Sequence, residues 1–213
     1  MAAALAAGWA MEAQFVAPGA AAVDGPGEVH ELAPNVIERV ASTESPQPVV
    51  AVFATRASTL ESLRGATFVI VADRLADPGN VGTVLRSAEA AGADAVVLTS
   101  GSVDVYNPKT VRASAGAIFH VPVVADVTID AVALAAPDLE LVGTSSHQGD
   151  AYDSLDLTGA VAIVLGNEAH GLDAGAPVHR WVRIPHRGRA ESLNVAMAAT
   201  VLAFEIARQR RAK

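Results

Sequence analysis

The sequence predicts an α/β fold, because apolar stretches of strand length alternate with helical patterns from about residue 66 onward. A second observation is that polar motifs directly follow several of these stretches, at the strand ends where open α/β sheets bind ligands. A third is that 51% of the 213 residues are hydrophobic, enough for one core and part of a second.

The expected main domain covers residues 66–213. Its apolar runs predict strands at 67–72, 95–99, 119–124, 139–143, 161–165 and 180–184. Helical periodicity and capping residues predict helices near 79–91, 108–116, 128–136 and 192–209. Asp77 with Pro78, and Asn107 with Pro108, are typical helix starts, because a capping side chain precedes a ring whose φ suits the first turn.

Residues 1–57 predict a smaller α/β domain, joined to the main one by a linker at 58–65. Helices are expected at 3–11 and 34–42, and strands at 14–16 and 49–53. Between them, residues 18–27 are rich in Gly and Pro and predict a loop.

Asn80 and Arg86 stand out as polar residues on an otherwise apolar helix. Asn80 lies in the first turn and Arg86 almost two turns later, on a flank of the apolar stripe. A helix with this pattern is suited to present both side chains to a ligand. A purely structural explanation would make Asn80 a polar residue of the helix start and Arg86 a surface arginine. This explanation is disfavoured because two further polar motifs occur in the chain.

Both further motifs follow strand candidates in the C-terminal third. Residues 166–172 come after the strand at 161–165, and their glycines permit sharp turns around Glu168. Residues 186–194 come after the strand at 180–184 and lead into the last helix, for which Ser192 is the expected N-cap. Free amides at that helix start favour anions and carboxylates.

These three motifs, in this order and spacing, resemble the signature motifs of the SpoU family, also called TrmH, of RNA ribose 2′-O-methyltransferases in the SPOUT superfamily. Asn80 with Arg86 resembles the first motif, 166–168 the second, and 184–185 with 192–194 the third. The resemblance implies a SPOUT-type knotted α/β domain with a deep trefoil knot. It also implies S-adenosylmethionine (AdoMet) as cofactor and a homodimer.

In such relatives the N-terminal domain binds the substrate, and residues 1–57 resemble only its second half. We therefore expect this domain to be incomplete, through a misassigned start or a natural shortening. The resemblance implies a structured RNA as substrate, with rRNA favoured over tRNA.

The resemblance also implies roles for single residues. Arg86 resembles the family's catalytic arginine, and because a guanidinium stays protonated in proteins, we expect it to bind phosphate and stabilise alkoxide charge. Asn80 and Ser192 are expected to orient the ribose, and Glu168 to hold Arg86, directly or across the dimer. The implied catalytic set is Asn80, Arg86, Glu168, Ser192 and Asn194. The implied cofactor-binding set, acting mainly through backbone groups, is Thr144, Leu165, Gly166, Asn167, Ile184, Ser192 and Leu193.

The net charge of -8 disfavours RNA binding, because phosphate contacts require Lys and Arg. Basic residues nevertheless gather near the motifs, and we expect RNA contacts at Lys109, Arg112, Arg187 and Arg189. In the helix near 108–116, the resemblance adds Asn107, Arg112 and Ser114 as secondary site candidates, although Asn107 is better explained as a cap.

Several other classes are excluded by missing features. The chain has no Cys, its 6 His lack ligand spacing, and neither G-x-G-x-x-G nor G-x-S-x-G occurs, so no metal site, nicotinamide site or hydrolase elbow is expected. His170 and His186 lie beside the motifs and are expected to be bystanders. No signal peptide and no membrane-spanning run are recognised, which predicts a cytoplasmic protein. The remaining alternative is a catalytically silent RNA-binding or scaffold protein of the same fold.

Overall fold

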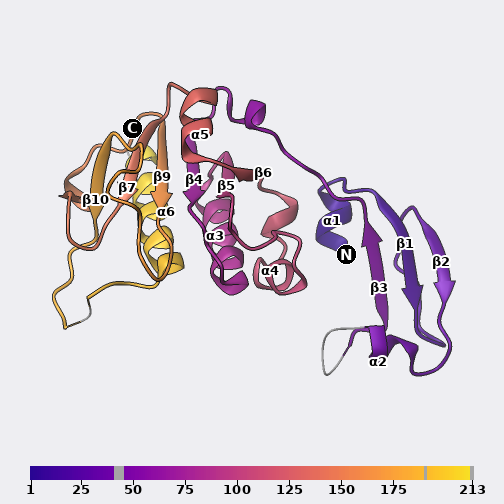
Figure 1. Ribbon diagram of the computed structural model, residues 1–213. Coiled ribbons are helices and arrows are strands. Elements are labelled where there is room, and N and C mark those ends of the chain that lie inside the picture. Colours follow the sequence, from indigo (N-terminus) through magenta and orange to yellow (C-terminus); the bar gives the residue numbers. More distant parts are fainter. Residues whose placement is uncertain (41–45, 190, 212–213) are drawn as a thin grey trace. The chain divides into compact units, whose positions relative to one another are not determined.

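The computed structural model describes residues 1–40, 46–189 and 191–211 (Figure 1). Contacts between residues divide the chain into two compact units, Met1–Arg56 and Ala57–Lys213. The larger unit contains the motifs, and its order of elements is that of an α/β domain.

The larger unit is built on a 7-stranded sheet with the strand order β6-β5-β4-β9-β7-β10-β8, in which all neighbouring strands pair in parallel. Its strands are β4 (Phe68–Ala72), β5 (Ala95–Thr99), β6 (Val123–Val127), β7 (Glu140–Thr144), β8 (Asp150–Ala151), β9 (Val161–Leu165) and β10 (Arg180–Arg183). The predicted α/β class is confirmed, and the trefoil knot stays a prediction.

Helices cover both faces of this sheet, which explains why its central strands read as continuous apolar runs. Alternate residues of β4 show this: Ile70 packs in a core with α3 (Pro78–Ala91) and α6 (Val195–Arg211). Val71 packs in a second core with α5 (Ile129–Ala135) and Leu63 of the short 3-10 helix η1 (Leu60–Leu63). Residues 60–63, inside the segment expected to be a linker, therefore contribute to the core of the larger unit.

Helices α3 and α4 (Pro108–Ala113) pack closely, because Gly82 of α3 has no Cβ that would overlap Ala113 of α4. At the other end of the unit, the guanidinium of Arg210 on α6 donates to the carbonyls of Thr67 and Gly159, both at 2.7 Å. These contacts tie α6 to the chain just before β4 and β9.

The strand predicted at 119–124 is wrong in position. Residues Ala117–Phe119 form a 3-10 helix, η2, and β6 begins only at Val123. The cause is local, because Ala115 and Gly116 adopt left-handed backbone conformations with φ of 50° and 97°. They end α4 at Ala113, short of the predicted 116, and start a turn in which the Val121 amide donates to the Ala117 carbonyl.

The last helix begins at Val195 and not at 192. Its cap is Asn194, whose side-chain oxygen accepts from the amides of Ala196 at 2.9 Å and Met197 at 3.3 Å. The prediction that Ser192 caps this helix is therefore wrong. The predicted caps of α3 and α4 are confirmed, since Asp77 and Asn107 each accept an amide of the first turn.

The smaller unit contains a 3-stranded sheet in the order β2-β1-β3, with β1 (Met11–Val16), β2 (Glu28–Glu31) and β3 (Val49–Phe53). Helix α1 covers Ala2–Ala6 and α2 covers Val36–Val40. The predicted helix at 3–11 is too long, because Gly8 turns the chain at φ 72° and β1 follows. Strand β2 was not predicted, since all four of its residues are exposed and give no apolar run. Residues 41–42 of the helix expected at 34–42 lie outside the described part of the chain.

Candidate active site

A cavity of about 640 Å³ opens where β7, β9 and β10 end. Three chain segments near the ends of these strands line most of it: residues 144–147, residues 166–172, and a third that consists of Ile184, His186 and residues 191–195. Two of the three predicted motifs therefore meet here. Ligand sites of open α/β sheets occupy this edge, because the connecting loops leave room beyond the carboxyl ends of parallel strands.

The loop after β9 closes tightly on itself. The amides of Asn167 and Gly171 donate to each other's carbonyls at 3.1 and 2.8 Å. A Cβ at position 166 would overlap the backbone of Gly171 and Leu172, so only glycine fits there. The predicted importance of Gly166 thus has a steric cause, and the closed loop presents Glu168 at its exposed tip.

Three predicted catalytic residues form one chain of hydrogen bonds, although they are far apart in sequence. The Asn80 amide nitrogen donates to Oε1 of Glu168 at 3.0 Å, and its oxygen accepts from Nδ2 of Asn194 at 3.0 Å. Asn80 is itself placed by Asp77, whose side chain accepts its backbone amide at 2.8 Å. The starts of α3 and α6 and the loop after β9 are therefore tied together at one point.

Glu168 is held as a carboxylate by its surroundings. Partial burial raises the pKa of Glu168, but hydrogen bonds from the Asn80 side chain and from backbone amides, including those of Asp77 and Ala76, outweigh it and lower the pKa below 4.5. The contacts from Ala76 and Asp77 are long, at 3.5 and 3.4 Å. At neutral pH this group is therefore an acceptor and carries a negative charge.

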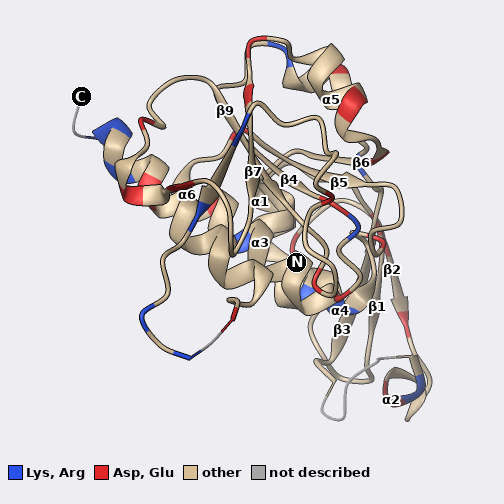
Figure 2. Ribbon diagram, turned by 60° about the vertical axis from the view of Figure 1, so that its left-hand side comes forward, with Lys and Arg blue, Asp and Glu red and all other residues tan. Residues whose placement is uncertain are grey.

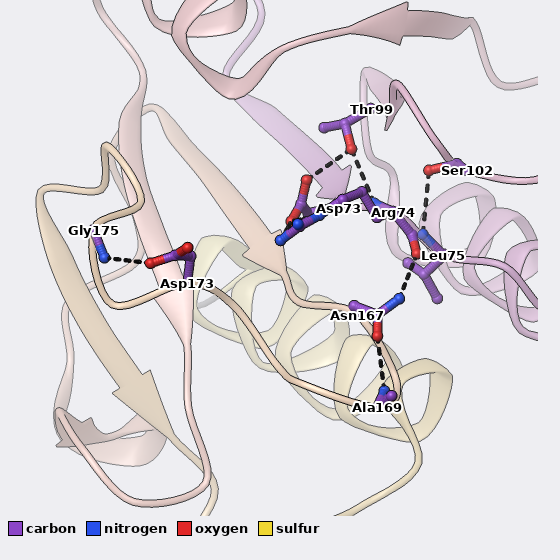
Figure 3. A network of polar contacts seen from close by, with 9 residues as sticks. All are labelled: Asp73, Arg74, Leu75, Thr99, Ser102, Asn167, Ala169, Asp173 and Gly175. Carbon is purple, nitrogen blue, oxygen red and sulfur yellow. Dashed lines mark hydrogen bonds and ion pairs between the residues drawn. The ribbon is translucent and has the colours of Figure 1, made fainter.

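A second polar network supports this arrangement from the end of β4 (Figure 3). The buried carboxylate of Asp73 accepts from the Thr99 hydroxyl at 2.8 Å and forms an ion pair with Arg74 at 2.9 Å. Arg74 adopts a left-handed backbone conformation with φ of 52°. Its carbonyl accepts from Nδ2 of Asn167 at 2.7 Å, while Oδ1 of Asn167 accepts from the Ala169 amide at 2.9 Å.

The Asn167 side chain is therefore bound within the protein, while Asn167 also lines the cavity, and the cofactor contact that the resemblance implied for it stays a prediction. Its side chain connects the turn after β4 to the loop that carries Glu168. Asp73, Arg74 and Thr99 belong to none of the three predicted motifs. Asp73 and Arg74 could have been predicted as site residues, because they are polar and directly follow a buried strand at the same sheet edge as the motifs.

The remaining predicted catalytic residues lie apart from this cluster. Arg86 is exposed on α3 and forms no hydrogen bond or ion pair with any residue that the structure describes. The expected contact from Glu168 to Arg86 is absent within the described part of one chain, since Glu168 contacts Asn80 instead. Ser192 is exposed on the cavity wall, three residues before α6 begins.

The cavity suits AdoMet in size, since drug-sized and nucleotide-sized ligands occupy sites of a few hundred Å³. Thr144, Gly166, Asn167, Ile184, Ser192 and Leu193 of the predicted cofactor set line it. Leu165 does not, because it is fully buried and its carbonyl accepts the Asp73 amide at 2.8 Å. Apolar walls come from Val182, Ile184, Leu193, Val195, Ala198 and Leu202. Nε2 of His186 is buried there without a partner among the described residues.

The predicted RNA-binding residues lie outside the cavity, on α4 and on the loop between β10 and α6. Lys109, Arg112, Arg187 and Arg189 are all exposed. Figure 2 shows basic residues on that loop and at the C-terminal end of α6, while acidic residues gather around α5. The acidic net charge is thus unevenly distributed over the larger unit.

The SpoU rRNA Methylase family matches residues 67–204, which include every motif described above. The chain belongs to this family. Among curated relatives, a 23S rRNA (guanosine(2553)-2′-O)-methyltransferase from Bacillus subtilis is 37% identical, covering 84% of this chain and 72% of that protein. A 23S rRNA (uridine(2479)-2′-O)-methyltransferase from Streptomyces viridochromogenes is 34% identical, covering 84% of this chain and 67% of that protein.

Solved structures of this SpoU family also resemble the chain. The SpoU methyltransferase AviRb from S. viridochromogenes, in complex with AdoMet, has a TM-score of 0.87 at 31% identity and covers 99% of this chain and 87% of its own. An AdoMet-bound rRNA methyltransferase from Sinorhizobium meliloti has a TM-score of 0.83 at 32% identity, over 96% and 82% of the two chains. The family resemblance inferred from the motifs is confirmed.

Among the described residues, no group of three or more His, Cys, Asp or Glu side chains is placed to hold a metal ion. In the same part of the chain, no helix has the length and apolar character needed to cross a bilayer.

Proposed function

We propose that this SpoU-family chain transfers a methyl group from AdoMet to a ribose 2′-hydroxyl of a structured RNA, with 23S rRNA as the substrate class. The observation that carries the proposal is the hydrogen-bond chain through Asn80, Glu168 and Asn194 beside a cavity of cofactor size. Family membership supports the reaction, and relatives named as 23S rRNA 2′-O-methyltransferases support the substrate class.

AdoMet supplies an electrophilic methyl group on a sulfonium, and the reaction forms a carbon–oxygen bond while the 2′-hydroxyl loses its proton. The protein must align the oxygen with the methyl group and stabilise negative charge on the oxygen. Ser192, exposed on the cavity wall, is placed to contact the ribose. Arg86 supplies a permanent positive charge for the adjacent phosphate and the developing alkoxide.

The cluster at Asn80 lacks Arg86, and we infer that a second copy of the chain supplies it. Support comes from an apolar stripe on α6, where Met197 is 61% exposed and Phe204 is 45% exposed, near Leu193 at 38%. Large apolar groups that share one helix face mark an interaction surface more often than isolated ones do. In the homodimer, α6 packs on the partner and Arg86 of one subunit faces the cavity of the other.

RNA is held by the basic residues around the cavity in this proposal. Lys109 and Arg112 on α4 and the loop residues Arg187 and Arg189 are exposed and lie on the larger unit. Recognition of structured RNA by shape and phosphate contacts needs no short motif. Since rRNA is the proposed substrate, we propose a cytoplasmic location.

Two measurements test the function. Isothermal titration calorimetry with S-adenosylhomocysteine is expected to show stoichiometric binding, because the cavity fits the cofactor. Transfer of radiolabelled methyl from AdoMet to 23S rRNA, followed by mapping of 2′-O-methyl sites, is expected to give one modified ribose. Cofactor binding without transfer to any RNA would favour the alternative of a catalytically silent RNA-binding or scaffold protein. A folded protein that does not bind the cofactor would reject both the proposed methyl transfer and the assignment of the cavity to AdoMet.

A further inference from the structure

His186 is a half-buried histidine that lines the cavity proposed for the cofactor. It follows Ile184 and Pro185 at the end of β10 and lines the cavity wall. Its Nε2 atom exposes less than 1 Å² and has no hydrogen-bond partner among the described residues. A buried polar nitrogen without a partner costs free energy, so native proteins rarely keep one unless a ligand or water completes it.

Other histidines and other buried nitrogens differ from His186. His147 and His170 also line the cavity, but both are exposed, so water satisfies their ring nitrogens. Buried Nε atoms of Arg180 and Arg210 belong to guanidinium groups whose other nitrogens are hydrogen-bonded. Of these residues, only His186 both lines the cavity and has a buried ring nitrogen without a partner among the described residues.

The surroundings of His186 favour a neutral ligand group. Val182 and Ile184, which precede His186 at the end of β10, line the cavity with apolar side chains. Moving a charged group from water into contact with such apolar side chains costs free energy. The amino and carboxylate ends of AdoMet therefore suit the exposed part of the cavity, whereas adenine and ribose offer neutral donors and acceptors to the imidazole ring.

We propose that Nε2 of His186 makes a hydrogen bond to the nucleoside part of AdoMet. The proposal rests on the proposed function, since it assigns a side chain to the same cavity. It replaces the expectation that His186 is a bystander. It also adds a side-chain contact to a site in which the expected cofactor contacts are mainly to backbone groups.

Calorimetry on substituted proteins tests this contact. Two ligands are used, S-adenosylhomocysteine and 5′-methylthioadenosine, which lacks the amino-acid end. His186→Phe keeps a planar ring but removes the nitrogen, and is expected to weaken both ligands by on the order of 10-fold. His186→Gln, whose amide nitrogen reaches about as far as Nε2, is expected to recover part of the affinity, and the shorter His186→Asn is not. His120→Phe changes an exposed histidine outside the cavity and serves as the control.

The outcomes separate the two proposals. If the unsubstituted protein binds neither ligand, the proposed function fails. If it binds both and His186→Phe binds them equally well, the His186 contact is rejected while the function stands. Loss of affinity for S-adenosylhomocysteine alone would place the contact at the amino-acid end and overturn the nucleoside assignment.

Nuclear magnetic resonance of the unsubstituted protein gives a readout that does not depend on how a variant folds. The chain has 6 His, few enough for their imidazole ¹⁵N signals to be assigned in a uniformly labelled sample. Saturation with S-adenosylhomocysteine is expected to shift the Nε2 signal of His186 and to leave that of His120 in place. An unchanged His186 signal at saturation would overturn the proposal.

Discussion

At the scale of single residues, three polar side chains of the site fix one another's direction. Asn194 both caps α6 and donates to Asn80, and Asn80 in turn donates to Glu168. An amide side chain suits this position, because it donates and accepts at the same time. Arg86 is different, since it has no such partner among the described residues and keeps its charge available for substrate.

Replacement of Arg86 by alanine is expected to reduce methyl transfer by about 100-fold or more, the scale for loss of one charge-stabilising donor. AdoMet affinity is expected to stay nearly unchanged, because Arg86 is proposed to contact the RNA phosphate and the developing alkoxide and not the cofactor. Single-turnover transfer and calorimetry measure the two effects. Glu89→Ala, an exposed charged residue on the same helix, is the matched control. Transfer within a few-fold of the unsubstituted protein would assign the catalytic charge to another residue.

Glu168 gives a prediction for pH. Its pKa is lowered in the folded protein, so the carboxylate contributes stability above its ordinary value of 4.5 and loses that contribution as pH falls through the lowered pKa. The unsubstituted protein is therefore expected to melt higher than Glu168→Gln at neutral pH, with the difference shrinking in acid. Thermal unfolding of both proteins from about pH 7 down to pH 3 tests this. A difference in Tm that is constant over this range would contradict the assignment.

At the scale of elements, the site depends on how three strand ends are connected. The turn after β4 accepts the Asn167 side chain at the Arg74 carbonyl, and Thr99 at the end of β5 holds the same turn by donating to Asp73. Figure 3 shows that these contacts join segments from three different strands. The loop that carries Glu168 is therefore positioned by the sheet and not by its own sequence alone.

Asn167→Asp tests this connection with an almost unchanged shape. The substitution places a carboxylate oxygen against the Arg74 carbonyl, so a hydrogen bond becomes a repulsion. We expect faster amide exchange across residues 166–172, as measured by hydrogen–deuterium exchange, and transfer reduced by at least about 10-fold. Asn107→Asp is the control for exchange, because aspartate caps α4 as well as asparagine does. Unchanged exchange in Asn167→Asp would show that the loop closes without this contact.

At the scale of the whole molecule, the site is proposed to need two chains and an RNA. Figure 1 shows α6 beside α3, and a bond of 2.6 Å between the hydroxyls of Ser87 and Thr200 joins them. A partner packed on α6 is thus coupled to the helix that carries Asn80 and Arg86.

Met197→Asp combined with Phe204→Asp is expected to give a monomer, because charges on the α6 stripe oppose burial of that face. Multi-angle light scattering measures the mass, and transfer is expected to fall with dimer content. Leu134→Asp is the matched control, since Leu134 is 84% exposed on α5, outside the proposed interface. A monomeric variant that retains full transfer would refute the shared site.

Arg187→Ala and Arg189→Ala test RNA binding by the loop before α6. Each lost phosphate contact is expected to reduce the slope of log K against log salt by about 1, with weaker binding overall. Filter binding of an rRNA fragment at several salt concentrations measures the slope. Arg64→Ala, an exposed arginine paired with Glu61, is the control. An unchanged slope in both loop variants would move the RNA contacts to other residues.

The sequence by itself determined the fold class, most strands and helices of the larger unit, and several of the residues that line the cavity. Their signals are local: strands buried on both faces need continuous apolar runs, and Asp77 caps α3 through its own first turn. Where the signal was weak, prediction failed. Strand β2 is exposed throughout and therefore has no apolar pattern. The position of β6 depends on residues 115–116, which adopt left-handed backbone conformations, and alanine at position 115 gives no sequence signal for such a conformation.

Only the tertiary structure decided which polar residues are partners. Within the described part of one chain, Glu168 contacts Asn80 and not Arg86, Asn194 and not Ser192 caps α6, and Asn167 is bound to the Arg74 carbonyl. These pairs lie about 90 residues apart or depend on where a helix begins within one turn. Sequence patterns indicate which side chains can form hydrogen bonds, but each such side chain could bond equally well to several different partners. The choice is made by the order of the strands, because it alone sets which loops meet at the edge of the sheet.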